Sequence, residues 1–279
     1  MRSRLRVIPG VRIASTICVA ALAAAMSACE KGPVEWGTDT RQLTVPVSGD
    51  ESSAAEAHLV LRADGSPALE PAPAVATAPA DSAACAGSLR IAALSPSEIY
   101  GVWWSRRDAG RAVLISARSE NSGATWMAPV PVDTTDRGPL SCARPAPSIA
   151  VDSASGYVHV TYFLNSPTGP GVFFSHSMER NDLFHAPVPI MYGERPSASA
   201  VTSADSVVLV AFENPSSQRA QIAIAMSRTW GHIFDQDRPE ASTGATSARR
   251  PLVALRQSKV AVGWRAQDRT VTARIGTLK

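Results

Sequence analysis

The sequence predicts an all-β fold built from repeated four-strand units. Short runs rich in Val, Ile and aromatic residues alternate with clusters of Gly, Pro, Ser, Asn and Asp, which is typical of strands and turns. No stretch after residue 28 keeps the 3.6-residue apolar period of an amphipathic helix. One turn pattern begins at Ser119, Ser177 and Ser227, at intervals of 58 and 50 residues. A repeat of that size, with four short strands in each unit, predicts a β-propeller in which each unit is a blade.

Each predicted unit has the same order of parts. An arginine precedes or begins a short apolar strand, a second strand ends in an aromatic residue, and a third strand leads into the turn and a fourth strand. Residues 86–279 hold about four such units, so the ring is small or incomplete. The last unit ends at Lys279 after three strands. We therefore expect a strand from residues 29–85, where 43–47 and 58–62 are strand-like, to supply the fourth.

The clearest copy of the turn contains Ser119, Asn121, Gly123, Thr125 and Trp126. Asn121 is expected to accept backbone N–H bonds within the turn, and Gly123 to take a positive φ at no steric cost. Trp126 is expected to bury its ring between neighbouring blades. These residues are therefore predicted to be structural.

This turn resembles the Asp-box (BNR) repeat of the sialidase-like propeller superfamily. Asn121 stands in the acidic position of the first copy, Asn181 in the glycine position of the second, and Thr229 in the acidic position of the third. The resemblance covers about residues 86–279 and implies the fold more specifically than the activity. The ring of that superfamily has six blades, more than this chain supplies.

The N-terminus is predicted to be a targeting segment. Basic residues up to Arg12 precede an apolar stretch at 13–26 that is too short to span a bilayer. The following Ser27-Ala28-Cys29 resembles a bacterial lipobox, which implies a signal peptide at 1–28 and a lipid-anchored Cys29 in the cell envelope. An ordinary signal peptide cleaved after Ala28 is the alternative. By resemblance to enterobacterial sorting rules, Glu30 favours the outer membrane; the side of the membrane stays open.

Residues 29–85 are predicted to be a flexible tether that includes the possible closing strand. The stretch at 65–84 is rich in Ala, Pro and Ser. Removing residues 1–28 takes four arginines and no acidic residue, so the charged residues change from 27 basic and 24 acidic to 23 and 24. No basic cluster remains that would indicate nucleic-acid binding.

Cysteine and histidine usage bounds the chemistry. With Cys18 in the signal peptide and Cys29 acylated, Cys85 and Cys142 remain, each just before the first strand of successive units. In an oxidising compartment these two are expected to form a disulfide. The five histidines show no metal-ligand spacing, and we predict no metal site and no cofactor.

The arginines that open the units are the candidate ligand-binding residues. If equivalent positions converge on the axis of the ring, Arg90, Arg144, Arg195 and Arg250 would form a receptor for carboxylate or phosphate. The resemblance supports this hypothesis, because sialidases clamp a carboxylate with three arginines from different blades. The alternative is that each arginine caps a blade edge or pairs with a neighbouring carboxylate.

The resemblance also implies a catalytic set of a Tyr nucleophile, a Glu partner and an Asp acid. The candidates here are Tyr192, Glu194 and Asp108, in predicted loops on the same rim as the arginines. The chain departs from the superfamily because its Arg-Ile-Pro motif is absent and Tyr192 and Glu194 are near neighbours. We therefore expect an envelope lipoprotein that binds an anionic glycan or a protein partner without catalysis. An exo-α-sialidase-type glycosidase and a structural adaptor are the alternatives.

Overall fold

The computed structural model describes residues 32–44, 57–107, 110–138, 140–244, 247–265 and 270–279. The regular elements given by these residues are β-strands and a short 3₁₀ helix, η3 (Ser141–Ala143). The predicted all-β class is therefore confirmed. No helix in the described ranges is long and apolar enough to cross a membrane. The predicted signal peptide and Cys29 lie outside these ranges.

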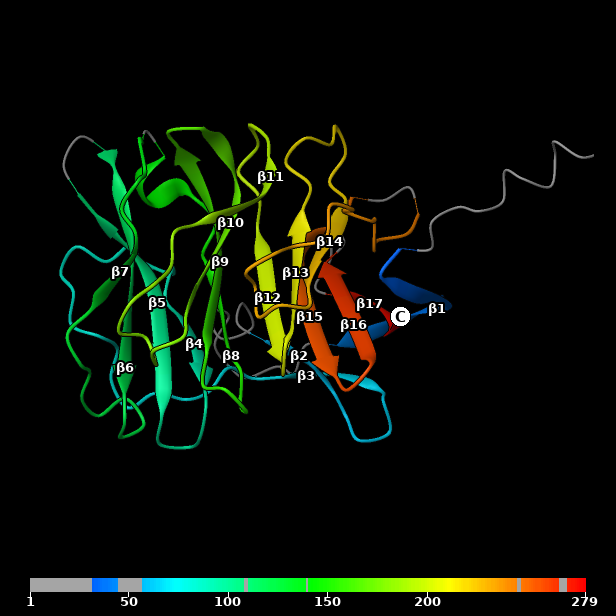
Figure 1. The fold of residues 1–279 in the computed structure, drawn as a ribbon, viewed down its shortest axis with the longest axis horizontal. Coiled ribbons are helices and arrows are strands. Elements are labelled where there is room, and N and C mark those ends of the chain that lie inside the picture. Colours follow the sequence, from blue (N-terminus) through cyan, green and yellow to red (C-terminus); the bar gives the residue numbers. More distant parts are fainter. Residues whose placement is uncertain (1–31, 45–56, 108–109, 139, 245–246, 266–269) are drawn as a thin grey trace, which may run out of the picture. The chain divides into compact units, whose positions relative to one another are not determined.

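The first two sheets each have four antiparallel strands and follow the predicted unit (Figure 1). The first contains β4 (Arg90–Ala93), β5 (Ile99–Arg106), β6 (Ala112–Ser119) and β7 (Val130–Asp133), in that order. The second contains β8 (Ser148–Val151), β9 (Val158–Ser166), β10 (Gly169–Ser177) and β11 (Val188–Tyr192), also in chain order.

The third sheet has three regular strands: β12 (Ser199–Ala204), β13 (Val207–Glu213) and β14 (Ile222–Ser227). A fourth segment follows the edge of β14 without becoming a strand. It is attached by isolated bridges between Ala223 and Glu240 and between Ser227 and Phe234.

The fourth sheet takes its outer strand from the N-terminal part of the chain. It contains β15 (Arg249–Arg256), β16 (Lys259–Arg265), β17 (Thr270–Leu278) and then β1 (Val34–Thr44). β1 runs antiparallel to β17 with Val34 opposite Leu278 and Thr44 opposite Thr270. The expected fourth strand is thus present, although it begins well before residue 43. The other strand-like stretch forms a separate hairpin of β2 (His58–Leu61) and β3 (Pro67–Glu70).

The sheets pack face to face because their middle strands are apolar on both sides. Successive side chains of a strand point to opposite faces. In β13, Val208, Val210 and Phe212 pack with residues of the second sheet, whereas Leu209 and Ala211 pack with residues of the fourth. All five side chains are fully buried. This explains why the strand is a continuous apolar run, whereas a strand with one exposed face would alternate apolar and polar residues. The arrangement supports the predicted propeller.

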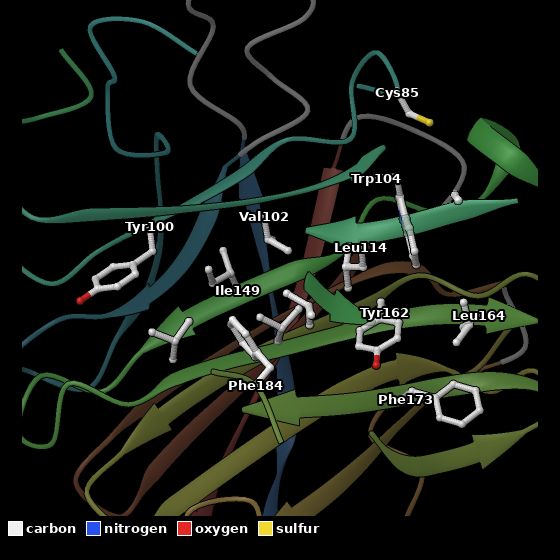
Figure 2. Close-up of a cluster of buried hydrophobic side chains, with 14 residues drawn as sticks. Cys85, Tyr100, Val102, Trp104, Leu114, Ile149, Tyr162, Leu164, Phe173 and Phe184 are labelled. Atoms are coloured by element: carbon white, nitrogen blue, oxygen red, sulfur yellow. The ribbon is translucent and has the colours of Figure 1, made fainter. Parts of the chain in front are cut away.

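The contact between the first and second sheets forms the largest apolar cluster (Figure 2). Trp104 of β5 meets Tyr162 of β9 edge to face, with ring centroids 5.9 Å apart. Phe173 of β10 stacks on Tyr162 at 6.3 Å. The Tyr162 hydroxyl donates a 2.6 Å hydrogen bond to Asp133, so the polar end of the buried ring is satisfied.

The predicted disulfide joins Cys85 to Cys142, with Cα atoms 5.2 Å apart. Cys85 is held on the first sheet, since its amide donates to the Trp104 carbonyl at 2.7 Å. The bond therefore links the stretch before β4 to the stretch before β8, as expected from the repeat.

Part of the predicted tether lies on the first sheet. The amides of Ala76 and Thr77 donate to the carbonyls of Ser122 and Gly123, at 3.0 and 3.1 Å. Asp81 accepts a 2.9 Å hydrogen bond from the Trp103 indole. An extended Pro-rich chain leaves its own backbone groups unpaired, so it is free to bond to a neighbouring turn. This stretch is thus held against the first sheet by hydrogen bonds.

The turn pattern recurs in three dimensions. The hydroxyls of Ser119, Ser177 and Ser227 each accept a hydrogen bond from the amide four residues on, at 2.9, 3.1 and 3.0 Å. The residue that donates has a φ of 81° at Gly123, 79° at Asn181 and 90° at Gly231. Asn tolerates this left-handed conformation better than most residues, which explains the second copy.

The remaining residues of the first turn behave partly as expected. Asn121 accepts from the Thr125 amide at 2.8 Å and donates to its hydroxyl at 2.8 Å. The prediction that the Trp126 ring is buried between neighbouring blades is wrong. Its ring is half-buried on the first sheet, and its indole N–H donates to the Thr77 carbonyl at 2.8 Å. The docked segment at 75–77 takes the place expected for a neighbouring blade.

Candidate functional site

The first strands of the sheets surround one pocket of about 400 Å³. Its wall is formed by residues of β2, β4, β8, β12, β15 and the end of β16. Short strands that each begin their unit are thus brought to a common place, which is what the repeat predicts for equivalent positions. A cavity of this volume lies within the range of small-molecule sites.

Three arginines line the pocket: Arg90, Arg250 and Arg265. The guanidinium of Arg90 donates to the carbonyls of Gly87 and Leu89, at 3.0 and 2.6 Å. Burial lowers the pKa of Arg265 from its ordinary value, and the positive charge of Arg250 lowers it further. Arg250 and Arg265 thus place two like charges at the pocket wall, where an anion would relieve their repulsion.

Arg250 is placed by its backbone. Its φ is 50°, and its amide donates to Glu213 at 2.8 Å. Glu213 ends β13 and is 5% exposed. The buried carboxylate therefore fixes the start of the fourth unit through the main chain and leaves the Arg250 side chain to line the pocket.

Arg144 does not line this pocket. Its guanidinium lies 2.9 Å from Asp136, with both side chains fully buried, and stacks over the Trp104 ring at 4.6 Å. Its Nε donates to the Ser141 carbonyl at 2.6 Å. These contacts correspond to the alternative in which the arginine pairs with a neighbouring carboxylate.

Arg195 also lies apart from the pocket lining. It donates to the carbonyls of Ser217 and Asn214, so it holds the loop that follows β13. Of the four arginines predicted to converge, the structure therefore brings Arg90 and Arg250 to the pocket. Arg144 instead pairs with the Asp136 carboxylate, and Arg195 donates hydrogen bonds to backbone carbonyls.

The catalytic candidates are not assembled at the pocket. Tyr192 ends β11, the outer strand of the second sheet, where its hydroxyl lies 3.1 Å from the Thr168 hydroxyl. Glu194 is exposed in the following loop. Neither lines the pocket, and Asp108 lies outside the described residues. The fourth strand of a unit is far from its first strand in the sheet order, which explains this separation.

Sequence reasoning missed Arg265 as a pocket residue. It stands directly after Trp264, the aromatic residue that ends the second strand of the last unit. Because neighbouring strands are antiparallel, the end of a second strand lies beside the start of the first, here Arg249 opposite Arg265. That pairing is the signal by which it could have been found.

The pocket offers the positive charge of three arginines and the imidazole of His58, and among its described lining residues there is no carboxylate. Such a set can bind an anion through charge-assisted hydrogen bonds. The histidines that lie close enough to share a metal, His176, His185 and His232, are not among its lining residues.

No family model matches this chain, and no curated protein matches its sequence. Solved structures similar to it include a Hadza microbial sialidase, with a TM-score of 0.47 and 13% identity over 64% of this chain and 42% of that one. An arabinanase from Bacillus subtilis has a TM-score of 0.42 and 11% identity over 88% and 94%. A polysaccharide lyase described as an ulvan lyase has 0.44 and 8% over 67% and 55%.

These similar proteins process glycans, and the chain spans less than half the length of the sialidase. At such identities the likeness concerns the fold alone. It carries no argument about what this chain binds or does.

Proposed function

We propose that this chain is an envelope lipoprotein whose sheets are the blades of a small propeller, and that its arginine-lined pocket binds an anionic glycan without cleaving it. The observation that carries the proposal is the convergence of Arg90, Arg250 and Arg265 on one cavity of about 400 Å³. Guanidinium groups match the planar geometry of carboxylates and remain charged at every physiological pH.

The pocket favours recognition over catalysis. Glycoside hydrolases usually need two carboxyl groups at the bond that breaks, or a Tyr nucleophile with its partners. The described lining residues include neither a carboxylate nor a tyrosine. A carboxylated glycan would be held by its charge and released unchanged.

The test is a titration of the full chain with a carboxylated oligosaccharide, such as oligogalacturonate, followed by calorimetry. A neutral oligosaccharide of the same length is the matched ligand. Arg250→Gln and Arg265→Gln each remove one charge from the pocket wall. Arg256→Gln is the matched control, because Arg256 is an exposed arginine at the other end of β15.

Losing one charged hydrogen-bond donor costs about 1.5–3 kcal/mol, which is roughly 10- to 150-fold in affinity. We expect that loss for both pocket variants, with Arg256→Gln unchanged and the neutral sugar unbound. Equal affinity of the pocket variants and the wild type would overturn the proposal. Product release from the oligosaccharide or from a fluorogenic sialoside would replace it with the glycosidase alternative.

The proposed anchor is tested separately. Cys29 follows Ser27-Ala28 after an apolar stretch, and acyl chains contribute about 0.8 kcal/mol per buried CH₂. Metabolic labelling with an alkynyl fatty acid is expected to mark the wild type but not Cys29→Ser. Labelling of that variant would contradict lipidation at Cys29.

A further inference from the structure

Three histidines from two sheets meet in one place. His176 is the penultimate residue of β10, His185 follows the second copy of the turn, and His232 lies within the third copy. One ligand atom from each lies within 4.8 Å of the others. The ring centroid of His176 is 4.5 Å from that of His185 and 4.6 Å from that of His232.

The backbone fixes this meeting. The amide of His185 donates to the His176 carbonyl at 2.9 Å, and the Ser175 hydroxyl donates to the His185 carbonyl at 2.7 Å. Gly231 has a φ of 90°, and a Cβ at this position would collide with the ring of Phe174 in β10. A glycine is therefore required for the third turn to approach β10 closely enough to place His232 beside His176.

The tautomer of His232 leaves the right nitrogen for a ligand. Its Nδ1 lies 2.7 Å from the Thr229 carbonyl oxygen. A carbonyl only accepts, so Nδ1 carries the proton and Nε2 keeps its lone pair. Histidines that bind metals commonly donate their other ring N–H to a carbonyl in this way, which fixes the ring orientation.

His176 contributes a buried nitrogen that needs a partner. The residue is 3% exposed, and its Nε2 has no hydrogen-bond partner among the described residues. Such an unsatisfied buried group is costly, and a metal ion would satisfy it. A neutral imidazole nitrogen with a free lone pair is the form that binds metals.

We propose that His176, His185 and His232 bind one Zn²⁺ ion. Imidazole suits zinc, and three protein ligands leave a fourth position for water or another small ligand. Zn–N bonds of about 2.0–2.1 Å in a tetrahedral site separate the nitrogens by about 3.4 Å, so the longest nitrogen–nitrogen separation must shorten by up to about 1.4 Å. His185 is open to solvent and can make that adjustment by rotating its side chain, while the His232 ring keeps its hydrogen bond to Thr229.

The sequence gives no hint of this site because the spacings are 9 and 47 residues. Short ligand spacings are typical of metal sites on one element or loop. Here His185 directly follows one copy of the repeated turn, His232 lies within the copy on the adjacent sheet, and His176 is in a strand. The site therefore follows from sheet packing and from the place of His185 and His232 relative to the turns.

The test is calorimetric titration of Zn²⁺ into the full chain with free thiols alkylated, supported by visible absorption of the Co²⁺ form. We expect one ion per chain with a dissociation constant in the micromolar range or tighter. His185→Ala and His232→Ala are each expected to weaken binding at least about tenfold. Both side chains are accessible, so these variants are expected to fold, and far-ultraviolet circular dichroism checks this.

Ile233→Ala is the matched control, because Ile233 neighbours His232 in the same turn and is 70% exposed. It is expected to bind Zn²⁺ like the wild type, with the Co²⁺ band of a tetrahedral site. Folded histidine variants that bind as tightly as the wild type would overturn the proposal. So would a wild type that shows no saturable binding up to about 100 μM Zn²⁺.

Discussion

Mutation of Arg144, which is buried in a pair with Asp136, tests whether this arginine is structural or binds a ligand. The two side chains are fully buried and joined at 2.9 Å. The same Asp136 oxygen accepts from the Ala112 amide at 2.8 Å. In Arg144→Ala the carboxylate keeps one neutral donor and loses its counter-charge, and the Trp104 ring loses the guanidinium stacked over it.

Removing one partner of a buried ion pair costs about 3–5 kcal/mol because the other charge is left uncompensated. At about 2–4 °C per kcal/mol for a domain of this size, the thermal midpoint should fall by roughly 6–20 °C. Differential scanning calorimetry and urea unfolding, both with the disulfide oxidised, measure this. Arg256→Ala, at an exposed position, should stay within about 0.5 kcal/mol of the wild type.

The same variant is informative about binding. Because Arg144 does not line the pocket, folded Arg144→Ala should bind a carboxylated oligosaccharide with wild-type affinity below its lowered midpoint. A variant as stable as the wild type that has lost binding would refute this reasoning, and would return Arg144 to the set of ligand-binding residues.

Three further predictions concern the scaffold. Replacing Cys85 and Cys142 by Ser should lower the unfolding free energy by about 4 kcal/mol in the chain-entropy model, given their separation of 57 residues, and an unchanged urea midpoint would contradict this. Gly123→Ala should lower the unfolding free energy, measured in urea, by at least about 1 kcal/mol more than Gly65→Ala does. Both glycines have a positive φ, but a Cβ at Gly123 would meet Val75 at 3.1 Å, whereas one at Gly65 would meet nothing within 4 Å. Burial lowers the folded-state pKa of His159 to about 4 from 6.5, so the neutral ring stabilises the fold fully above pH 6.5 and this stabilisation is lost as the pH falls to 4. Equilibrium unfolding should therefore show up to about 3 kcal/mol of acid destabilisation that is removed in His159→Phe. The same dependence of the unfolding free energy on pH in wild type and variant would argue against this.

Much of the fold was predictable because short sequence patterns, the apolar runs and the repeated turn, determine the local backbone. The apolar runs predicted the strands, and the serine and left-handed residues of the turn make the same backbone hydrogen bonds in three copies. The fourth strand of the last sheet was predictable by counting, since the last unit lacked one. Its identity as residues 34–44 was less so, because β1 is mostly exposed and lacks a strong apolar pattern.

The site was predictable only in part. The repeat placed an arginine near the start of each unit, and this correctly indicated where Arg90 and Arg250 lie. It gave no information on side-chain direction, which depends on local partners such as Asp136 for Arg144 and the Asn214 carbonyl for Arg195. These partners lie in irregular segments, where spacing predicts little.

Anion binding at the pocket is tested most directly by a crystal structure of the full chain soaked with oligogalacturonate at saturating concentration. We expect a carboxylate within hydrogen-bond distance of Arg250 or Arg265, in the cavity between β4, β8, β12 and β15. Ligand density elsewhere on the chain with this cavity empty would contradict it.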